Sequence, residues 1–233
     1  MAGEPTTKTL YCIRHGESTF NEWRKQSIWN FSWIWVRDPM IIDAPLSAKG
    51  EQQAQQLHQT IKSKKLDERV EIIITSPLTR AVQTMVGGFQ DASIPILLEP
   101  SCREMLDTAC DIGRQPDELA ASFANLNVDF YSLEQCWWLP PHKRPADTKS
   151  SLSFIPKTHE QVLPFRESVA DVDARIKALL TKLNELPEKH IAIVGHSAFF
   201  KRMLGMNRKL HNCELYEVPF AEAASRYGIH IDA

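Results

Sequence analysis

Two histidines and two arginines of this chain stand where apolar runs come to an end. Arg14 and His15 directly follow one such run, His196 follows another, and Arg80 lies a few residues beyond a third. A neutral imidazole can attack phosphorus when its other ring nitrogen is held by an acceptor. Guanidinium groups can clamp phosphoryl oxygens, and a glycine such as Gly16 lets the backbone approach an anion. These residue types favour phosphoryl transfer, which depends mainly on positioning and charge stabilisation.

The same chemistry needs a carboxylic acid that protonates the leaving oxygen. Glu104 follows a short apolar run and is the candidate for this role, with Glu99 and Asp107 as competing acids. The alternative for Glu104 is a surface carboxylate that pairs with Arg103.

The second histidine has a different task in this scheme. A protonated His196 would add positive charge where the equatorial phosphoryl oxygens need it. Ser197, the next residue, is a further candidate phosphate ligand. Because cationic and hydrogen-bond-donating groups would then surround the phosphate, we expect neither a metal site nor a cofactor.

The elements that must hold these residues alternate along the chain. β-Branched apolar runs predict strands, and apolar positions three to four residues apart predict helices. The expected strands lie at 8–14, 70–76, 94–98 and 190–197, and the expected helices at 46–62, 78–88, 117–126, 166–186 and from Ser197 onward. This order predicts an α/β fold with a three-layer αβα arrangement, in which helices cover both faces of a mostly parallel open sheet. The run at 213–220 would suit an antiparallel edge strand because it contains Pro219.

In a sheet of this type, ligands bind outside the carboxyl ends of the strands. The candidate residues should therefore converge on one edge of the sheet, although they are far apart in the sequence.

The length of 233 residues suits one domain, which we expect to span 1–233. Two segments, at about 22–45 and 127–165, break the alternation and are expected to be long inserted loops. Both contain tryptophans, which would be either core and loop-anchoring residues or an apolar wall over a substrate.

Composition argues against several classes of protein. A general binder of nucleic acids or membrane surfaces would show a basic excess, whereas the net charge here is −2. No apolar run approaches the ~18 residues of a membrane span, and the first residues lack the apolar core of a secretory signal. The five cysteines form no Cys-x-x-Cys pair. We therefore expect reduced cysteines in a protein of the cytoplasm, with the nucleus as an additional location left open.

Three motifs in order resemble the histidine phosphatase superfamily, also called the phosphoglycerate mutase-like family. They are Arg14-His15-Gly16-Glu17, the run 75–84 around Arg80, and Gly195-His196-Ser197. The resemblance implies that His15 forms a phosphohistidine intermediate and that Glu104 is the proton donor. It also implies that the phosphoryl group is bound by Arg14, Asn21, Arg80 and His196.

Departures from the mutase pattern point to the phosphatase branch of this family. Mutase-type members usually carry Glu-Arg-His-Tyr-Gly around the acid and Gly-Asn after the second histidine, whereas Arg103-Glu104-Met105 and Ser197-Ala198 stand here. The stretch 110–113 and the pair Trp137-Trp138 resemble a subgroup of mutase-like proteins of plants, fungi and other eukaryotes.

The resemblance thus implies a metal-independent phosphomonoester hydrolase. Phosphoglycerate mutase or sugar bisphosphatase activity and a non-catalytic phosphate-binding regulatory protein remain as alternatives. The expected partner is a small phosphorylated substrate, with phosphate or sulfate able to bind in the pocket, and neither a nucleic acid nor a membrane is expected.

Overall fold

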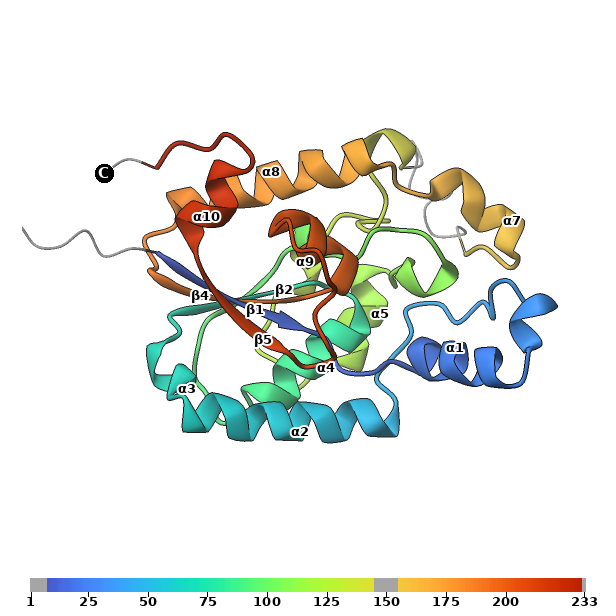
Figure 1. Ribbon diagram of the computed structural model, residues 1–233, viewed down its shortest axis with the longest axis horizontal. Coiled ribbons are helices and arrows are strands. Elements are labelled where there is room, and N and C mark those ends of the chain that lie inside the picture. Colours follow the sequence, from blue (N-terminus) through green and yellow to red (C-terminus); the bar gives the residue numbers. More distant parts are fainter. Residues whose placement is uncertain (1–7, 145–154, 232–233) are drawn as a thin grey trace, which may run out of the picture.

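Five strands form one sheet at the centre of the computed structural model, which describes residues 8–144 and 155–231 (Figure 1). The strands are β1 (Thr9–Arg14), β2 (Ile72–Thr75), β3 (Ile96–Leu98), β4 (His190–Gly195) and β5 (Leu215–Pro219). They lie in the order β3-β2-β4-β1-β5. The first four are parallel, and β5 runs antiparallel to β1 at the edge. The predicted mostly parallel sheet with an antiparallel edge strand is confirmed.

Pairing across the sheet aligns the carboxyl ends of β1, β2 and β4. Arg14 pairs with Gly195 in the β1–β4 ladder. The backbone N–H of His15 donates to the carbonyl oxygen of Gly195 at 2.9 Å, and that of Ser76 donates to the carbonyl oxygen of Val194 at 3.0 Å. The segments that follow these three strands therefore leave the sheet at one edge, as expected for parallel strands.

Helices cover both faces of the sheet. Those on one face are α2 (Ala48–Ser63) and α4 (Thr79–Gly88), and those on the other are α8 (Val169–Glu185), α9 (Ser197–Met203) and α10 (Phe220–Ser225), as Figure 1 shows. Side chains of β1 pack alternately into the cores on the two faces of the sheet, because successive residues of a strand point to opposite faces. Tyr11 and Ile13 belong to the core on the α4 side, and Leu10 and Cys12 to the core on the α8 side. The three-layer αβα arrangement is confirmed.

Hydroxyl caps help to define where the two long helices begin. The side chain of Ser47 accepts the backbone N–H of Gly50 at the start of α2, and that of Ser168 accepts the N–H of Asp171 at the start of α8. Each cap satisfies one of the N–H groups that a helix start leaves without an intrahelical partner.

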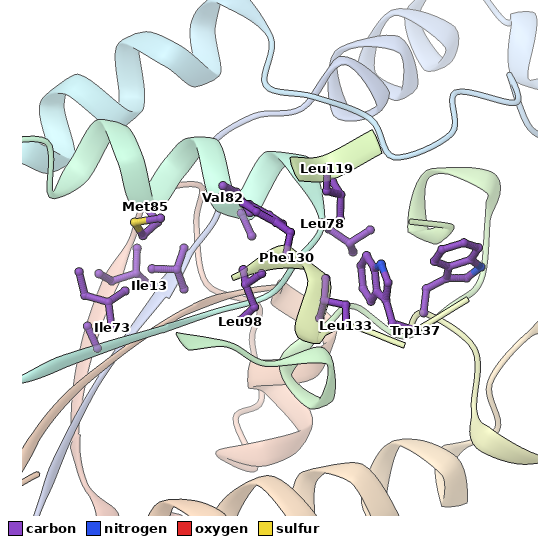
Figure 2. Close-up of a cluster of buried hydrophobic side chains, with 14 of the residues drawn as sticks. Ile13, Ile73, Leu78, Val82, Met85, Leu98, Leu119, Phe130, Leu133 and Trp137 are labelled. Atoms are coloured by element: carbon purple, nitrogen blue, oxygen red, sulfur yellow. The ribbon is translucent and has the colours of Figure 1, made fainter. Parts of the chain in front are cut away.

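The core on the α4 side extends beyond the sheet into the second insertion. Figure 2 shows Ile73 of the sheet and Met85 of α4 in one cluster with Phe130 and Trp137, which come from this insertion. Trp137 and its neighbour Trp138 are fully buried. Of the two expected roles for tryptophan, these two residues have the core role.

The first insertion is partly helical, contrary to the expected long loop. Its first part is α1 (Thr19–Trp29), and a turn of 3₁₀ helix, η1 (Ser32–Ile34), follows. Only Phe20 and Ser27 of α1 are buried. The sequence therefore lacks the apolar periodicity from which a helix is normally recognised.

The remaining elements are short. They are α3 (Leu66–Arg69), α5 (Pro116–Ser122), α7 (His159–Val162) and the 3₁₀ turns η2 (Pro100–Cys102), η3 (Ala109–Asp111), η4 (Phe130–Ser132), η5 (Pro141–Lys143) and η6 (Leu163–Phe165). Residues 145–154 of the second insertion lie outside the described part, so its extent and the single-domain assignment stay predictions. In the two described ranges, no helix has the length and apolar content needed to cross a membrane.

Candidate active site

A cavity of about 1000 Å³ opens at the carboxyl edge of the sheet. Its lining includes six of the residues singled out from the sequence: Arg14, His15, Asn21, Arg80, Glu104 and Ser197. These residues come from segments that are distant in the chain. The convergence expected from the strand ends is therefore present, with His196 buried beside His15.

His15 is held in one orientation by its own backbone. The Nδ1 atom of its ring lies 2.6 Å from the carbonyl oxygen of Gly16. A carbonyl can only accept, so Nδ1 carries the proton and the lone pair of the neutral ring is on Nε2. Burial, followed by the positive charges of Arg80 and Arg14, lowers the pKa of His15 well below its ordinary value. The ring is therefore neutral near pH 7, the form a nucleophile requires.

His196 faces the first histidine from the end of β4. The centroids of the two rings are 5.1 Å apart, at an interplanar angle of 54°. The Nε2 atom of His196 lies 2.8 Å from the hydroxyl oxygen of Ser76. Its Nδ1 atom is buried and has no hydrogen-bond partner among the described residues, which leaves this nitrogen available to a bound anion.

The protonated state expected of His196 beside a phosphoryl group stays a prediction, and its surroundings in the protein favour the neutral form. Burial, then Arg80 and His15, lowers the pKa of His196 well below its ordinary value. Sequence could indicate the position of this histidine but not its desolvation, which depends on the tertiary packing around it. Without an added negative charge beside it, the ring is therefore neutral near pH 7.

The two arginines are fixed by different partners. The guanidinium group of Arg80 donates to the carbonyl oxygen of Cys110 at 2.5 Å and to the carboxylate of Asp111 at 2.9 Å. Arg14 donates from Nη1 to the carbonyl oxygen of Leu210 at 2.6 Å, and its buried Nε has no partner in the described part of the chain. Both side chains therefore have fixed positions and remaining N–H groups in or beside the cavity.

The carboxylate of Glu104 contacts the first turn of α9, which is distant in the sequence. Its carboxylate accepts the backbone N–H of Phe199 at 3.1 Å and that of Ala198 at 3.3 Å. Arg103 points elsewhere, since it donates to the buried carboxylate of Glu167 at 2.5 Å. The alternative of a surface Arg103–Glu104 pair is therefore wrong.

The two competing acids occupy different surroundings. Glu99 pairs with Lys182 at 2.6 Å and does not line the cavity. Asp107 lines the cavity but is 64% exposed in its side chain and pairs with Arg166 at 3.2 Å. Of the three carboxylates considered, Glu104 is thus the one that is both fixed and directed to the pocket by its backbone partners.

Asn21 lines the cavity and also takes part in the capping box at the start of α1. Its Oδ1 atom accepts the N–H of Ser18 at 3.3 Å, and its own N–H donates to the hydroxyl of Ser18 at 3.2 Å. The side-chain amide nitrogen of Asn21 is then the group that could donate to a phosphate. Ser18 lines the cavity as well and was not a candidate from the sequence.

Asp111 is the main site residue that the sequence reasoning missed. Its Oδ1 atom holds Arg80, and its Oδ2 atom accepts the backbone N–H groups of Asp107 at 3.3 Å and Thr108 at 3.2 Å. Burial raises the pKa of Asp111 to about 6, although Arg80 acts in the opposite direction. The only signal was the stretch 110–113, noted for its resemblance to a subgroup and given no role.

Gly16 allows a close approach between two backbone segments. A Cβ atom there would lie 2.8 Å from the carbonyl oxygen of Gly50 in α2, and one on Gly50 would lie 2.0 Å from the carbonyl oxygen of Glu17. The room left by Gly16 is thus used by the protein backbone, in contrast to the expected approach to an anion. The contact places the His15 loop against the start of α2.

No group of three or more His, Cys, Asp and Glu side chains with the geometry to hold a metal ion occurs within residues 8–144 and 155–231. The cavity is instead lined by the side chains of Arg14, His15 and Arg80, and the ring of His196 lies beside that of His15.

Comparison with known families agrees with this arrangement. The model of the family described as "Histidine phosphatase superfamily (branch 1)" matches residues 10–150, more than half of the chain. The chain belongs to the histidine phosphatase superfamily. The expectation of a histidine phosphatase enzyme is confirmed at this level.

Curated relatives of this histidine phosphatase carry both phosphatase and mutase-like names. A Schizosaccharomyces pombe protein named "Probable phosphatase" is 28% identical over 207 residues, which cover 82% of this chain and 88% of the relative. "Phosphoglycerate mutase-like protein 1" of Arabidopsis thaliana is 27% identical over 250 residues, covering 89% of this chain and 79% of the relative.

Solved structures support the fold. The alpha-ribazole phosphatase of Shigella flexneri superposes with a TM-score of 0.52 at 21% identity and covers 90% of this chain and 89% of its own. A mycobacterial glucosyl-3-phosphoglycerate phosphatase gives a TM-score of 0.50 at 18% identity, with 91% and 89% coverage. At these identities the likeness establishes the shared architecture.

Proposed function

We propose that this histidine phosphatase hydrolyses phosphomonoesters without a metal ion, through a phosphohistidine intermediate on His15. The observation that carries the proposal is the bond from Nδ1 of His15 to the carbonyl of Gly16. This bond presents the lone pair of Nε2, and burial keeps the ring neutral because it lowers the pKa of His15. A fixed, neutral imidazole beside two arginines is suited to in-line attack on a phosphoryl group.

In the first step, Nε2 of His15 forms a bond to phosphorus while the bond between phosphorus and the leaving oxygen breaks. Glu104 gives its proton to that oxygen, and the alcohol departs. Arg14 and Arg80 bind the equatorial oxygens, and His196 contributes a further N–H from Nδ1. That N–H is present if the Ser76 hydroxyl donates to Nε2 of His196, or if the bound anion causes His196 to take up a proton.

In the second step, water attacks the phosphohistidine. The Glu104 carboxylate takes a proton from the water as the new oxygen–phosphorus bond forms and the nitrogen–phosphorus bond breaks. Phosphate leaves, and His15 returns to the neutral form with Nδ1 still bonded to Gly16. Each group is thus ready for another cycle, with no redox change and no co-reactant besides water.

The substrate in this proposal is a small phosphomonoester. The cavity is larger than a phosphate ion needs, and beyond the phosphate-binding residues it is lined by Phe20, Trp23 and Trp33. Aromatic walls of this kind suit the organic part of a substrate. Free phosphate or sulfate would occupy the position of the phosphoryl group between Arg14 and Arg80.

A panel of phosphomonoesters tests the proposed function. We expect phosphate release from a chromogenic aryl phosphate and from at least one member of a set of sugar phosphates, nucleotides, phytate and phosphopeptides. Some relatives carry mutase-like names, so transfer from a bisphosphorylated donor to a monophosphate should be measured in parallel. Transfer without net hydrolysis would favour a mutase, and binding of vanadate without turnover of any substrate would favour a regulatory protein.

A further inference from the structure

The segment 28–36, here called the aromatic tip, exposes nearly all of its apolar side chains. Trp29 is 89% exposed, Trp35 85% and Phe31 65%. The segment contains no charged residue. Single exposed apolar residues are common on soluble proteins, but a contiguous set of this size marks a surface that contacts something else.

The cavity accounts for only part of the aromatic tip. Ile28, Trp33 and Val36 line the cavity, whereas Trp29, Phe31 and Trp35 do not. The three most exposed aromatic rings of the tip are therefore outside the proposed substrate site. Binding a substrate gives no reason for their exposure.

Cationic side chains surround the aromatic tip. Arg24 precedes it on α1, Arg37 directly follows it, and Lys209 lines the cavity that part of the tip also lines. These three side chains make no ion pair within 4 Å in the described part of the chain. Two exposed carboxylates also lie in this region, Glu22 on α1 and Glu160 on α7. Among these five side chains around the uncharged tip, the cations exceed the carboxylates by one.

We propose that the aromatic tip docks this protein on the surface of an anionic lipid bilayer. Tryptophan and phenylalanine rings insert favourably at the boundary between headgroups and acyl chains, and nearby Arg and Lys bind the lipid phosphates. Whole-chain charge gave the opposite expectation, because a net charge of −2 does not favour general adsorption. The proposed attachment instead depends on the apolar side chains of the tip and not on the net charge of the whole chain.

The shape and charge of this region favour a membrane over a second copy of the chain. Figure 1 shows α1 and the turn after it projecting away from the sheet at one end of the molecule, near α7. A projecting tip suits insertion into a soft interface better than it suits a broad flat contact. A two-fold dimer through the tips would also bring Arg24 and Arg37 of both copies toward one another, which is unfavourable.

Insertion of the aromatic tip into the bilayer would place the cavity beside the membrane surface, because Trp33 and Val36 belong to both the tip and the cavity lining. The proposal goes beyond the hydrolysis argued above and does not depend on it.

Vesicle sedimentation tests the docking. The full chain is mixed with phosphatidylcholine vesicles that contain or lack phosphatidylserine, and the double variant Trp29→Ser/Trp35→Ser is compared with the wild type. We expect the wild type to bind the vesicles with phosphatidylserine more strongly, and the double variant to lose about tenfold or more in partitioning. Vesicles should also shift tryptophan emission of the wild type to shorter wavelength.

Tyr131 supplies a matched control, since it is 76% exposed but lies outside the tip. Tyr131→Ser should bind vesicles as the wild type does. Hydrolysis of a chromogenic phosphomonoester should be unchanged in the double variant, which shows that it is folded. Equal vesicle binding by the wild type and the double variant, or no binding by either, would overturn the proposal. Sedimentation equilibrium in which only the wild type dimerises, without vesicle binding, would assign the tip to a second copy instead.

Discussion

The Nδ1 atom of His15 donates to the carbonyl oxygen of Gly16, the next residue, over 2.6 Å. This single bond fixes both the orientation of the ring and the nitrogen that carries the lone pair. The position of Gly16 is fixed in turn by two contacts. Its N–H donates to the hydroxyl of Thr84 at 3.0 Å, and its backbone packs against that of Gly50. The reactivity proposed for His15 thus rests on contacts between the β1 loop, α2 and α4.

Replacing Glu104 by Gln should slow hydrolysis in a way that depends on the leaving group. The variant cannot protonate an alkoxide, so turnover of an alkyl phosphate should fall by about 100-fold or more, while an aryl phosphate with a good leaving group should lose much less. The measurement is kcat/KM over a series of leaving groups. Asp107→Asn is the matched control, because it removes a carboxylate at the rim of the same cavity. Equal slowing of every substrate by Glu104→Gln would remove Glu104 from the acid role.

Asp111→Asn should lower kcat/KM by about tenfold to 100-fold through misplacement of Arg80. The carboxylate holds the guanidinium group at 2.9 Å, and a neutral amide would hold it less firmly. We regard Asp111 as a positioning residue because it acts through Arg80. The unfolding temperature should be measured alongside, since loss of a partner from a buried ion pair also destabilises the fold.

The pH profile separates positioning by Asp111 from a merely structural role. Because burial raises the pKa of Asp111 to about 6, its carboxylate becomes neutral as the pH falls through that value. The ionic hold on Arg80 is then lost, so kcat/KM of the wild type should decline below about pH 6. In Asp111→Asn this decline should disappear, and a fall should occur only at lower pH, where His15 takes up a proton. An unchanged acid limb in the variant would contradict this account.

Removal of metal ions should leave activity unchanged. In the proposed mechanism, positive charge at the phosphoryl group comes from Arg14, Arg80 and the two histidines, so no Lewis acid is needed. The test compares rates before and after dialysis against EDTA, with magnesium added back to a third sample. Activity that EDTA abolishes and magnesium restores would contradict the metal-independent mechanism.

Trp137→Ala should destabilise the protein by about 3–5 kcal/mol, because it empties a fully buried site in the core. Trp29→Ala should change the free energy of unfolding by less than about 0.5 kcal/mol, since that ring is exposed. Urea unfolding of the two variants makes the comparison. Similar stability for both would mean that the second insertion is not part of the core.

The sequence was sufficient for the parts of the fold that local patterns encode. Continuous β-branched runs located β1, β2 and β4, and the residues after them identified the edge where His15, Arg80 and His196 meet. These features depend on periodicity and on a general rule for parallel sheets. Neither the strand positions nor the shared edge of the sheet required knowledge of contacts between residues that are distant in the sequence.

Tertiary contacts account for what the sequence did not predict. α1 buries only two of its side chains, so its helical pattern is weak. A core role was one of the two expected for Trp137, but its contact with Gly113, where a Cβ atom would collide with the ring, was not predicted. The neutral state of His196 follows from burial, and the role of Asp111 follows from its contact with Arg80. None of these relationships is visible in the spacing of residues along the chain.

Trapping the covalent intermediate tests the central claim most directly. The enzyme is mixed rapidly with an aryl phosphate, quenched in alkali and analysed by peptide mass spectrometry. We predict one added phosphoryl group, labile to acid, on the peptide that contains His15, with none in His15→Ala and normal labelling in His159→Gln, which alters another histidine of the cavity lining. A phosphoryl group on a different residue, or full turnover by His15→Ala, would contradict the account.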